Sequence, residues 1–304
     1  MLTKTSTRHK NRIRPCLQDR IVLRLDEILM ALFALIIAYP LLFVVFSSFE
    51  GQVSTLSLNI LPKKWSLEGY KAVFEYHWIW IGYRNSIFYT LFGTLTGLAF
   101  CVLAAYPLSQ PNLDGRKFFM GLFVFTMYFS GGLIPTYLTM RDYGMLDSVW
   151  ALLLPGAANV YNMIIMCTYF STQIPRELKE ASELDGCGEI RYLLQIVLPL
   201  SVPMLMVVGL YFAVGIWNSY FDAMIYMSTR SKMPLSIFLR DILILNNNSD
   251  MAAMMDPDAI ASFQERQNVM KYALIMVSSV PMFLLYPFVQ RYFIKGVMIG
   301  SVKG

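Results

Sequence analysis

Six long apolar stretches constrain this chain more than any other feature of its sequence. They cover residues 28–49, 85–106, 118–138, 149–170, 196–217 and 272–290. A helix rises 1.5 Å per residue, so about 20 apolar residues cross the roughly 30 Å hydrocarbon core of a bilayer. Gly131, Gly132 and Pro135 interrupt the third stretch, a break that neighbouring helices or a water-filled path can satisfy. We therefore expect an all-α, polytopic membrane protein with six transmembrane helices.

The charge of the chain supports a membrane protein over a soluble one. Only 15% of the residues are charged, whereas soluble domains carry roughly 25%. The net charge of +5 raises nucleic-acid binding as an alternative, but seven basic residues fall in the first 24 positions, just before the first apolar stretch. That placement is typical of the cytoplasmic flank of a membrane helix. The stretch at 28–49 also exceeds the 7–15 apolar residues or so of a signal peptide, so we expect a retained helix.

The distribution of Lys and Arg predicts the orientation. With the N-terminus inside, the cytoplasmic segments hold 15 of the 25 basic residues, as the positive-inside rule requires. Both termini are then cytoplasmic, and the protein is a multi-pass protein of the cell membrane. The expected organisation is a basic cytoplasmic arm at 1–27, a first helix and external loop at 28–84, a transmembrane core at 85–290, and a cytoplasmic tail at 291–304.

Several chemistries find no support in the sequence. There is no phosphate-binding GxxxxGK[ST] loop, no CxxC or HExxH spacing and no Ser/His/Asp arrangement. We therefore expect no enzyme activity, no metal and no cofactor bound by this chain. Cys16 and Cys187 fall in cytoplasmic segments, and Cys101 and Cys167 fall within helices, where we expect packing roles. Charged residues are nearly absent from the six stretches, which disfavours an ion-coupled carrier because such carriers bind their ion at mid-membrane.

The most informative segment is the loop at 174–203, between the fourth and fifth stretches. Pro175 suits a helix start, and Leu178, Ala181 and Leu184 then share one helical face. Asp185-Gly186 is a turn signal, because Gly186 can adopt the left-handed conformation that ends a helix. A second apolar stripe leads from Ile190 to Val197 and on to Pro199. The simplest interpretation is a surface connection, but so much helical order favours a docking element.

The same loop resembles the EAA loop of binding-protein-dependent ABC importer permeases. That pattern is EAA, three residues, Gly, nine residues and I-x-LP, and the matching residues here are Glu180, Ala181, Ser182, Gly186, Ile196, Leu198 and Pro199. The upstream IPREL, Trp217-Asn218 and the closing QRYFIKGVMIGSVKG resemble the carbohydrate branch related to the maltose permease subunit MalG. SGGLIPTYL at 130–138 resembles the oligosaccharide subgroup that includes LplC and YtcP.

This resemblance implies the type I importer permease fold and a mechanism. The chain would be one permease of a heterodimer that works with two ATPase subunits and an extracytoplasmic sugar-binding protein. ATP and Mg would be bound, and ATP hydrolysed, only by the partner subunits. The cargo, a sugar or oligosaccharide, would cross by alternating access. The residues implied in ATPase coupling are Glu180, Ala181, Ser182, Leu184, Asp185 and Gly186.

The C-terminal tail and the substrate path are two further candidate sites. The tail resembles a segment that reaches between the two ATPase subunits, which implicates Gly300, Ser301, Val302, Lys303 and Gly304; the simpler alternative is a frayed end. Sugar sites combine aromatic faces with fixed hydrogen-bonding groups, and the candidates are Asn159, Tyr161, Asn162, Tyr211, Trp217, Asn218 and Tyr220. These side chains can equally bond between helices or anchor the protein at the membrane interface.

Three alternatives stay open at this stage. The first is an ABC permease for another small solute, such as an amino acid. The second is a stand-alone, ion-coupled sugar carrier, which the EAA spacing and the lack of mid-membrane charge disfavour. The third is a membrane-bound enzyme, for which no catalytic constellation is present.

Overall fold

The structure, a computed structural model, describes residues 17–50, 62, 64–244, 270–287 and 290. Within these residues every regular element is helical, and extended pairing is limited to an isolated bridge between Glu50 and Trp65. The predicted all-α class is therefore confirmed.

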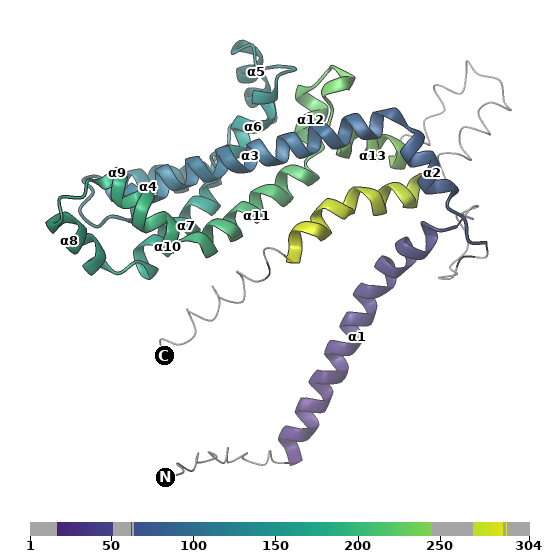
Figure 1. The fold of residues 1–304 in the computed structure, drawn as a ribbon, viewed down its shortest axis with the longest axis horizontal. Coiled ribbons are helices and arrows are strands. Elements are labelled where there is room, and N and C mark those ends of the chain that lie inside the picture. The colour runs from purple at the N-terminus through teal and green to yellow at the C-terminus, as the bar shows by residue number, and fades with distance from the viewer. Residues whose placement is uncertain (1–16, 51–61, 63, 245–269, 288–289, 291–304) are drawn as a thin grey trace, which may run out of the picture.

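The longest helix, α3 (His77–Ser109), is the spine of the fold. It runs the length of the body, with α7 (Val160–Gln173) and α11 (Val202–Asn218) packed against it (Figure 1). Two glycines on α3 permit this close approach. A Cβ on Gly97 would lie 2.7 Å from the Phe212 ring, and one on Gly93 would lie 2.6 Å from the Ile216 side chain. Small residues at helix crossings let backbones pack tightly inside membranes.

The two larger of three groups of buried apolar side chains hold most of the helices together. The first joins α3, α7 and α11 and includes Met166 and Phe212. It also contains Cys101 and Cys167, which are buried as expected for packing residues. The second joins α2 (Glu68–Glu75), the start of α3, α13 (Leu235–Ile244) and the helix Met270–Pro287. The core thus lies on both flanks of the α3 spine.

The number of membrane spans depends on how bent helices are counted. Three helices are long and apolar enough by themselves: Ile21–Ser47 within α1 (Leu17–Ser47), α3, and Met270–Pro287. Three more candidates are pairs of shorter helices separated by a sharp bend. The described part of the chain therefore holds three spans, or up to six if each bent pair is one span.

The bends lie at residues that disfavour a continuous helix. α4 (Arg116–Tyr128) and α5 (Leu133–Asp142) meet at 110°, and Gly132 has a φ of +89° at the break that the sequence predicts. Two further breaks, inside the apolar stretches at 149–170 and 196–217, were not predicted from the sequence. α6 (Val149–Ala157) ends before Asn159, whose side chain accepts a hydrogen bond from Asn162 N at 3.0 Å and starts α7.

The other unexpected break lies at Ser201. The helical segment Glu189–Leu200 bends by 81° into α11, and Pro203 near the start of α11 has no N–H to continue the preceding helix. This segment consists of α9 (Glu189–Tyr192), the π-helix η1 (Leu193–Val197) and α10 (Leu198–Leu200). This segment follows the Gly186 turn and leads into α11.

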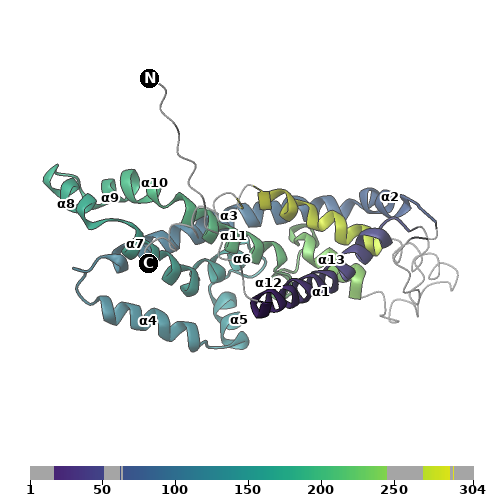
Figure 2. The same ribbon diagram turned by 90° about the horizontal axis from the view of Figure 1, so that it is seen from below.

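α1 runs out from the body in Figure 1, and in both views its end lies close to the helix Met270–Pro287 (Figures 1 and 2). It begins at Leu17, earlier than the predicted residue 28, so Arg24 and Glu27 pair on the helix itself at 3.1 Å. Its apolar stretch is not buried by the rest of the chain, and only its end packs, with the Phe43 ring edge-on to Tyr272 at 5.8 Å. A helix that is apolar on all sides needs lipid or another subunit around it.

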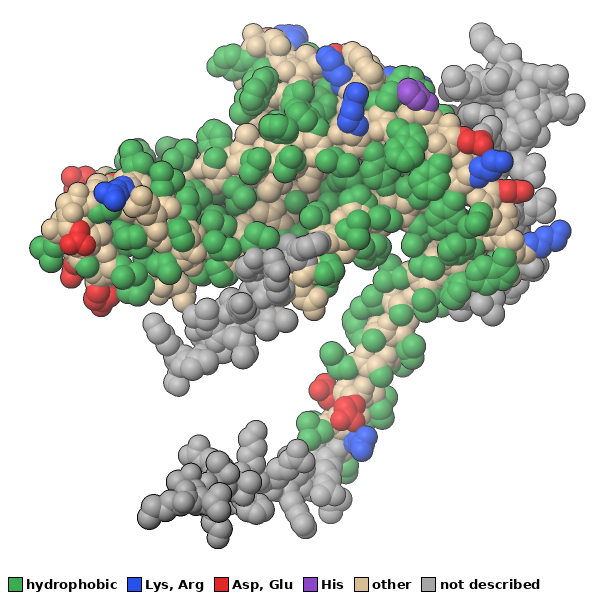
Figure 3. Space-filling model, in the orientation of Figure 1, with side chains coloured by type: hydrophobic (Ala, Val, Ile, Leu, Met, Phe, Trp, Pro, Cys, Tyr) green, Lys and Arg blue, Asp and Glu red, His purple; other side chains and the backbone are tan. Residues whose placement is uncertain are grey.

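The surface agrees with a membrane protein. Apolar side chains cover the flanks of the body and of α1, whereas charged side chains gather at the end that carries α8 (Arg176–Leu184), around α2 and near α5 and α12 (Phe221–Tyr226) (Figure 3).

Candidate functional site

The loop at 174–203, which we call the coupling loop, forms one extreme end of the body (Figure 1). Pro175 is the residue before α8, and Glu177 lies in the first turn, where the helix dipole favours an acid. α8 ends at Leu184, Asp185 caps it, and Gly186 follows with a φ of +71°. The predicted order of helix, glycine turn and second short helix is thus what the structure shows.

The predicted coupling residues divide between two faces of α8. Glu180, Ala181, Asp185 and Gly186 are exposed, and Leu184 is 90% exposed although it is apolar. Ser182 points inward instead: it is buried, and its hydroxyl donates to the carbonyl of Lys179 at 2.7 Å. The outer face of α8 therefore presents an acid beside uncovered apolar side chains, while Ser182 supports the helix from behind.

The inner face of α8 is held by contacts that sequence reasoning missed. Lys179 Nζ lies 2.9 Å from Glu189 Oε1 and donates to Gln110 Oε1 at 3.0 Å. Glu189 Oε2 accepts a hydrogen bond from the Tyr106 hydroxyl of α3. This hydrogen bond, and then the Lys179 ammonium, lower the pKa of the Glu189 carboxyl. The only signal in the sequence was that Lys179 falls on a different helical face from Leu184, five residues later.

A second group of residues forms a pocket of about 210 Å³ among α3, α6, α7, α11 and α12. We call it the Asn162 pocket. Three of the predicted substrate-path residues, Asn159, Asn162 and Tyr211, line it together. The sequence did not single out its other polar residues, which are Ser86, Tyr89, Ser219 and Asp222.

The remaining substrate-path candidates lie elsewhere. Trp217, Asn218 and Tyr220 line a separate pocket of about 530 Å³ beside α13 and Met270–Pro287. Their polar groups are partly used within the protein, since Trp217 Nε1 donates to Ser278 O at 3.2 Å and Asn218 Nδ2 to Val214 O at 2.9 Å. Tyr161 is 56% exposed and lines neither pocket.

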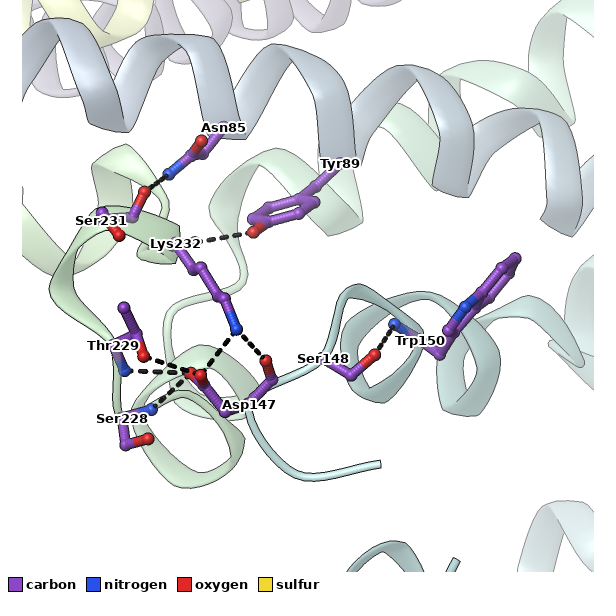
Figure 4. A network of polar contacts seen from close by, with 9 residues as sticks. All are labelled: Asn85, Tyr89, Asp147, Ser148, Trp150, Ser228, Thr229, Ser231 and Lys232. Carbon is purple, nitrogen blue, oxygen red and sulfur yellow. Dashed lines mark hydrogen bonds and ion pairs between the residues drawn. The ribbon is translucent and has the colours of Figure 1, made fainter. Parts of the chain in front are cut away.

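A polar network at the other end of the bundle centres on Asp147 (Figure 4). Its carboxylate accepts hydrogen bonds from Lys232 Nζ at 2.7 Å and from the backbone and hydroxyl of Thr229 at 2.9 and 2.7 Å. These donors, Lys232 first, hold the pKa of the Asp147 carboxyl well below its usual range.

The same network reaches α3. The Tyr89 hydroxyl donates to Lys232 O at 2.7 Å, and the Asn85 amide donates to Ser231 O at 2.8 Å (Figure 4). The network therefore connects the linker before α6, the turn η2 (Arg230–Lys232) and α3. It adjoins the Asn162 pocket, because Tyr89 also lines that pocket.

The tail residues Gly300, Ser301, Val302, Lys303 and Gly304 lie outside the described residues. Among the described residues, no group of three or more His, Cys, Asp or Glu side chains is placed to hold a metal ion.

Comparisons with known proteins identify relatives of this chain along most of its length. The chain is 41% identical to protein LplC of Bacillus subtilis over 267 residues, 87% of this chain and 89% of that protein. It is 39% identical to the polygalacturonan/rhamnogalacturonan transport system permease protein YtcP of the same organism, over 90% of this chain and 95% of that protein.

A solved structure agrees with these relatives, although a scan against models of known protein families finds no match. A bacterial ABC transporter involved in the import of the acidic polysaccharide alginate contains a chain with a TM-score of 0.83 and 33% identity. The match covers 92% of this chain and 99% of that one. With an EAA-type coupling loop, a nearly all-helical fold and relatives of this length, the chain belongs to the multi-pass permease subunits of carbohydrate-type ABC importers.

Proposed function

We propose that this chain is one of two different permeases that enclose a path for a sugar or oligosaccharide, with its coupling loop docked on a separate ATPase subunit. The outer face of α8 carries this proposal. Leu184 is 90% exposed and Glu180 and Ala181 lie exposed on the same short helix, while Lys179 and Ser182 hold its inner face against the body. A rigidly held helix with an uncovered acidic and apolar face fits docking in a groove on a partner.

The contacts also suggest how movement of α8 reaches the membrane. Lys179 and Glu189 connect α8 to Tyr106 on α3, and the π-helix and the bend at Ser201 connect α9 to α11. Both α3 and α11 contribute walls to the Asn162 pocket. ATPase closure that displaces α8 would thus move two walls of one pocket, which is what alternating access between two states requires.

The remaining parts of the proposed importer follow from the family. YtcP and the alginate importer are named for polysaccharides, which supports a sugar-chain cargo delivered by an extracytoplasmic binding protein. ATP and Mg would be held by two ATPase subunits. The second permease would cover part of the apolar surface that α1 leaves open. Both termini and the coupling loop would lie in the cytoplasm, as the distribution of basic residues predicts.

A cysteine at Leu184 tests docking and orientation together. In a variant whose native cysteines are replaced, Leu184→Cys should react with a membrane-impermeant thiol reagent only after the cells are opened. Lys64→Cys, exposed on the predicted outer side, should react in intact cells. In the assembled importer, a bifunctional thiol reagent should link Leu184→Cys to the ATPase subunit, and the buried Ser182→Cys should give no such product. Labelling of Leu184→Cys from outside, or no cross-link to the ATPase, would contradict the proposal.

A further inference from the structure

The Asn162 pocket contains a buried amide that the described part of the protein leaves without a partner. Asn162 is 4% exposed, and its side chain makes no hydrogen bond to another described residue, whereas its backbone N–H donates to Asn159 Oδ1. An amide has two donor hydrogens and an acceptor oxygen, and burying them unpaired is unfavourable in a membrane interior. Since Asn162 lines the pocket, a ligand or water there is the available partner.

The charge of the pocket is negative. Asp222, an exposed residue, is the only acidic or basic side chain in the lining, and among the described residues no basic side chain lies within ion-pair distance of it. Ser219 donates to Asp222 Oδ2 at 3.1 Å, and Oδ1 has no partner among the described residues. A carboxylate accepts several hydrogen bonds and suits hydroxyl donors, whereas a second carboxylate beside it would be repelled.

The other walls fit a ring with an apolar face. Tyr211 is 45% exposed, and Tyr89 is fixed because its hydroxyl donates to Lys232 O. The volume of about 210 Å³ is below the roughly 300–1,000 Å³ of pockets that enclose drug-sized ligands, so it holds a single ring rather than a chain.

We propose that the Asn162 pocket holds one uncharged, hydroxyl-bearing sugar ring of the cargo, and that Asp222 selects against a ring that carries a carboxylate, which distinguishes this site from the acidic cargo for which the similar alginate importer is named. The inference rests on the proposed sugar transport and adds the class of ring that this site accepts. The amide of Asn162 supplies donors and an acceptor to the ring hydroxyls, and Asp222 accepts from a hydroxyl. The pocket beside α13 is the weaker candidate, because Asn218 and Ser236 already donate to backbone carbonyls there.

The lining itself offers a reporter position. Gly156 lines the pocket, and a Cβ added to it would meet no atom within 4 Å, so Gly156→Cys is tolerated by the space available. Gly121 on α4 has equally open surroundings and does not line the pocket, which makes Gly121→Cys the matched control. Both are introduced into the full chain without native cysteines, assembled with its partner subunits.

The first measurement uses two thiol reagents of similar size, the cationic aminoethyl and the anionic sulfonatoethyl methanethiosulfonates. At Gly156→Cys the cationic reagent should react faster, and Asp222→Asn should lower the cation-to-anion rate ratio by about tenfold. At Gly121→Cys the ratio should not respond to Asp222→Asn. An unchanged ratio at Gly156→Cys overturns the electrostatic part of the proposal.

The second measurement is protection of Gly156→Cys by a matched pair of probes, methyl galactoside and the methyl glycoside of galacturonic acid, whose carboxyl group is free. The neutral glycoside should slow labelling at concentrations several-fold lower than the uronate. Asp222→Asn should remove this difference, and Asn162→Leu should weaken protection by both. Equal protection in the wild-type background, stronger protection by the uronate, or protection by neither overturns the proposal. Failure of the Leu184→Cys cross-link is a separate result, since it removes the importer assembly and not the selectivity of the pocket.

Discussion

The ammonium of Lys179 lies 2.9 Å from Glu189 Oε1, across the Gly186 turn that separates α8 from α9. The other carboxylate oxygen of Glu189 accepts from Tyr106, and Lys179 also donates to Gln110. One ion pair therefore fastens both halves of the coupling loop to the end of α3. Displacement of α8 by a bound partner would pass through this pair.

Reversing one charge of this pair should weaken coupling, and reversing both should restore it. Lys179→Glu places a third carboxylate beside Glu183 and Glu189, while Lys179→Glu combined with Glu189→Lys recreates the attraction. The pair is partly solvated, so its net contribution is about 1 kcal/mol, which corresponds to roughly a fivefold effect. We expect cargo moved per ATP hydrolysed to fall about that much in Lys179→Glu, at equal subunit assembly.

Glu183→Lys is the matched control for that experiment. Glu183 lies 3.9 Å from Lys179, against 2.9 Å for Glu189, and takes no part in the hydrogen bond from Tyr106, so its reversal should change coupling less. If the double variant is no better than Lys179→Glu, the contribution of the ion pair to coupling is refuted.

Glu180→Lys should act by a different route, through loss of docking. Glu180 is exposed on the outer face of α8, so the variant should insert and fold normally. A reversed charge at an interface leaves two like charges together and costs a few kcal/mol. We expect the ATPase subunit to co-purify at least tenfold less with this variant. Glu177→Lys is the control on the first turn of the same helix, and wild-type uptake by Glu180→Lys would refute the docking role.

The sequence predicted the helix and the glycine turn of the coupling loop well, because both depend on residues that are close together in the chain. The apolar spacing of α8 and the left-handed Gly186 both appear at the expected positions. The inward position of Ser182 was not predictable from the sequence, because a small, weakly polar side chain is found on both buried and exposed helix faces. Lys179 and Glu189 were not paired either, because their contact requires the turn between α8 and α9 and the arrival of Tyr106 from a helix more than 70 residues away.

In the apolar helices, too, the sequence did not predict features that depend on single residues or on distant contacts. Hydropathy predicts apolar stretches but is insensitive to a break caused by a single cap, as at Asn159, or by a proline just inside a helix, as at Pro203. The Asn162 pocket combines residues from five helices. The sequence therefore predicted that Asn159, Asn162 and Tyr211 are polar groups within the bundle, but it did not identify Asp222 as the charge that faces the same space.

Asp147→Asn should loosen the end of the bundle that carries η2. The substitution keeps the shape of a side chain that tolerates the φ of +56° found here, and it removes the charge that Lys232 and Thr229 bind. Charged hydrogen bonds contribute about 1.5–3 kcal/mol each when undisturbed, and this carboxylate is partly exposed, so we expect a loss of about 1–2 kcal/mol. Thermal unfolding of the purified complex at pH 7 measures it, with Asp142→Asn as the exposed control.

The sign of the pH dependence follows from the lowered pKa of Asp147. A carboxyl whose pKa is lower in the folded protein stabilises the fold fully above its unfolded pKa of about 3.9, and this contribution is lost as the pH falls toward the folded value. The stability difference between wild type and Asp147→Asn should therefore be constant from pH 5 upward and shrink only below about pH 4. A difference that disappears between pH 5 and 7 would mean that Asp147 does not make these bonds in solution.

Deletion of residues 300–304 distinguishes a working tail from a frayed end. Gly300, Ser301, Val302, Lys303 and Gly304 are too rich in glycine to form a stable helix alone, and small residues can enter a narrow crevice between subunits. We propose that this tail contacts the closed ATPase pair, where Lys303 supplies a positive charge. The deletion should then lower transport and ATP hydrolysis together while the subunits still co-purify, and Lys303→Ala should reproduce part of the loss. Lys295→Ala, earlier in the same tail, is the control for charge alone. A truncated protein that assembles and transports at the full rate would leave the tail as a frayed end.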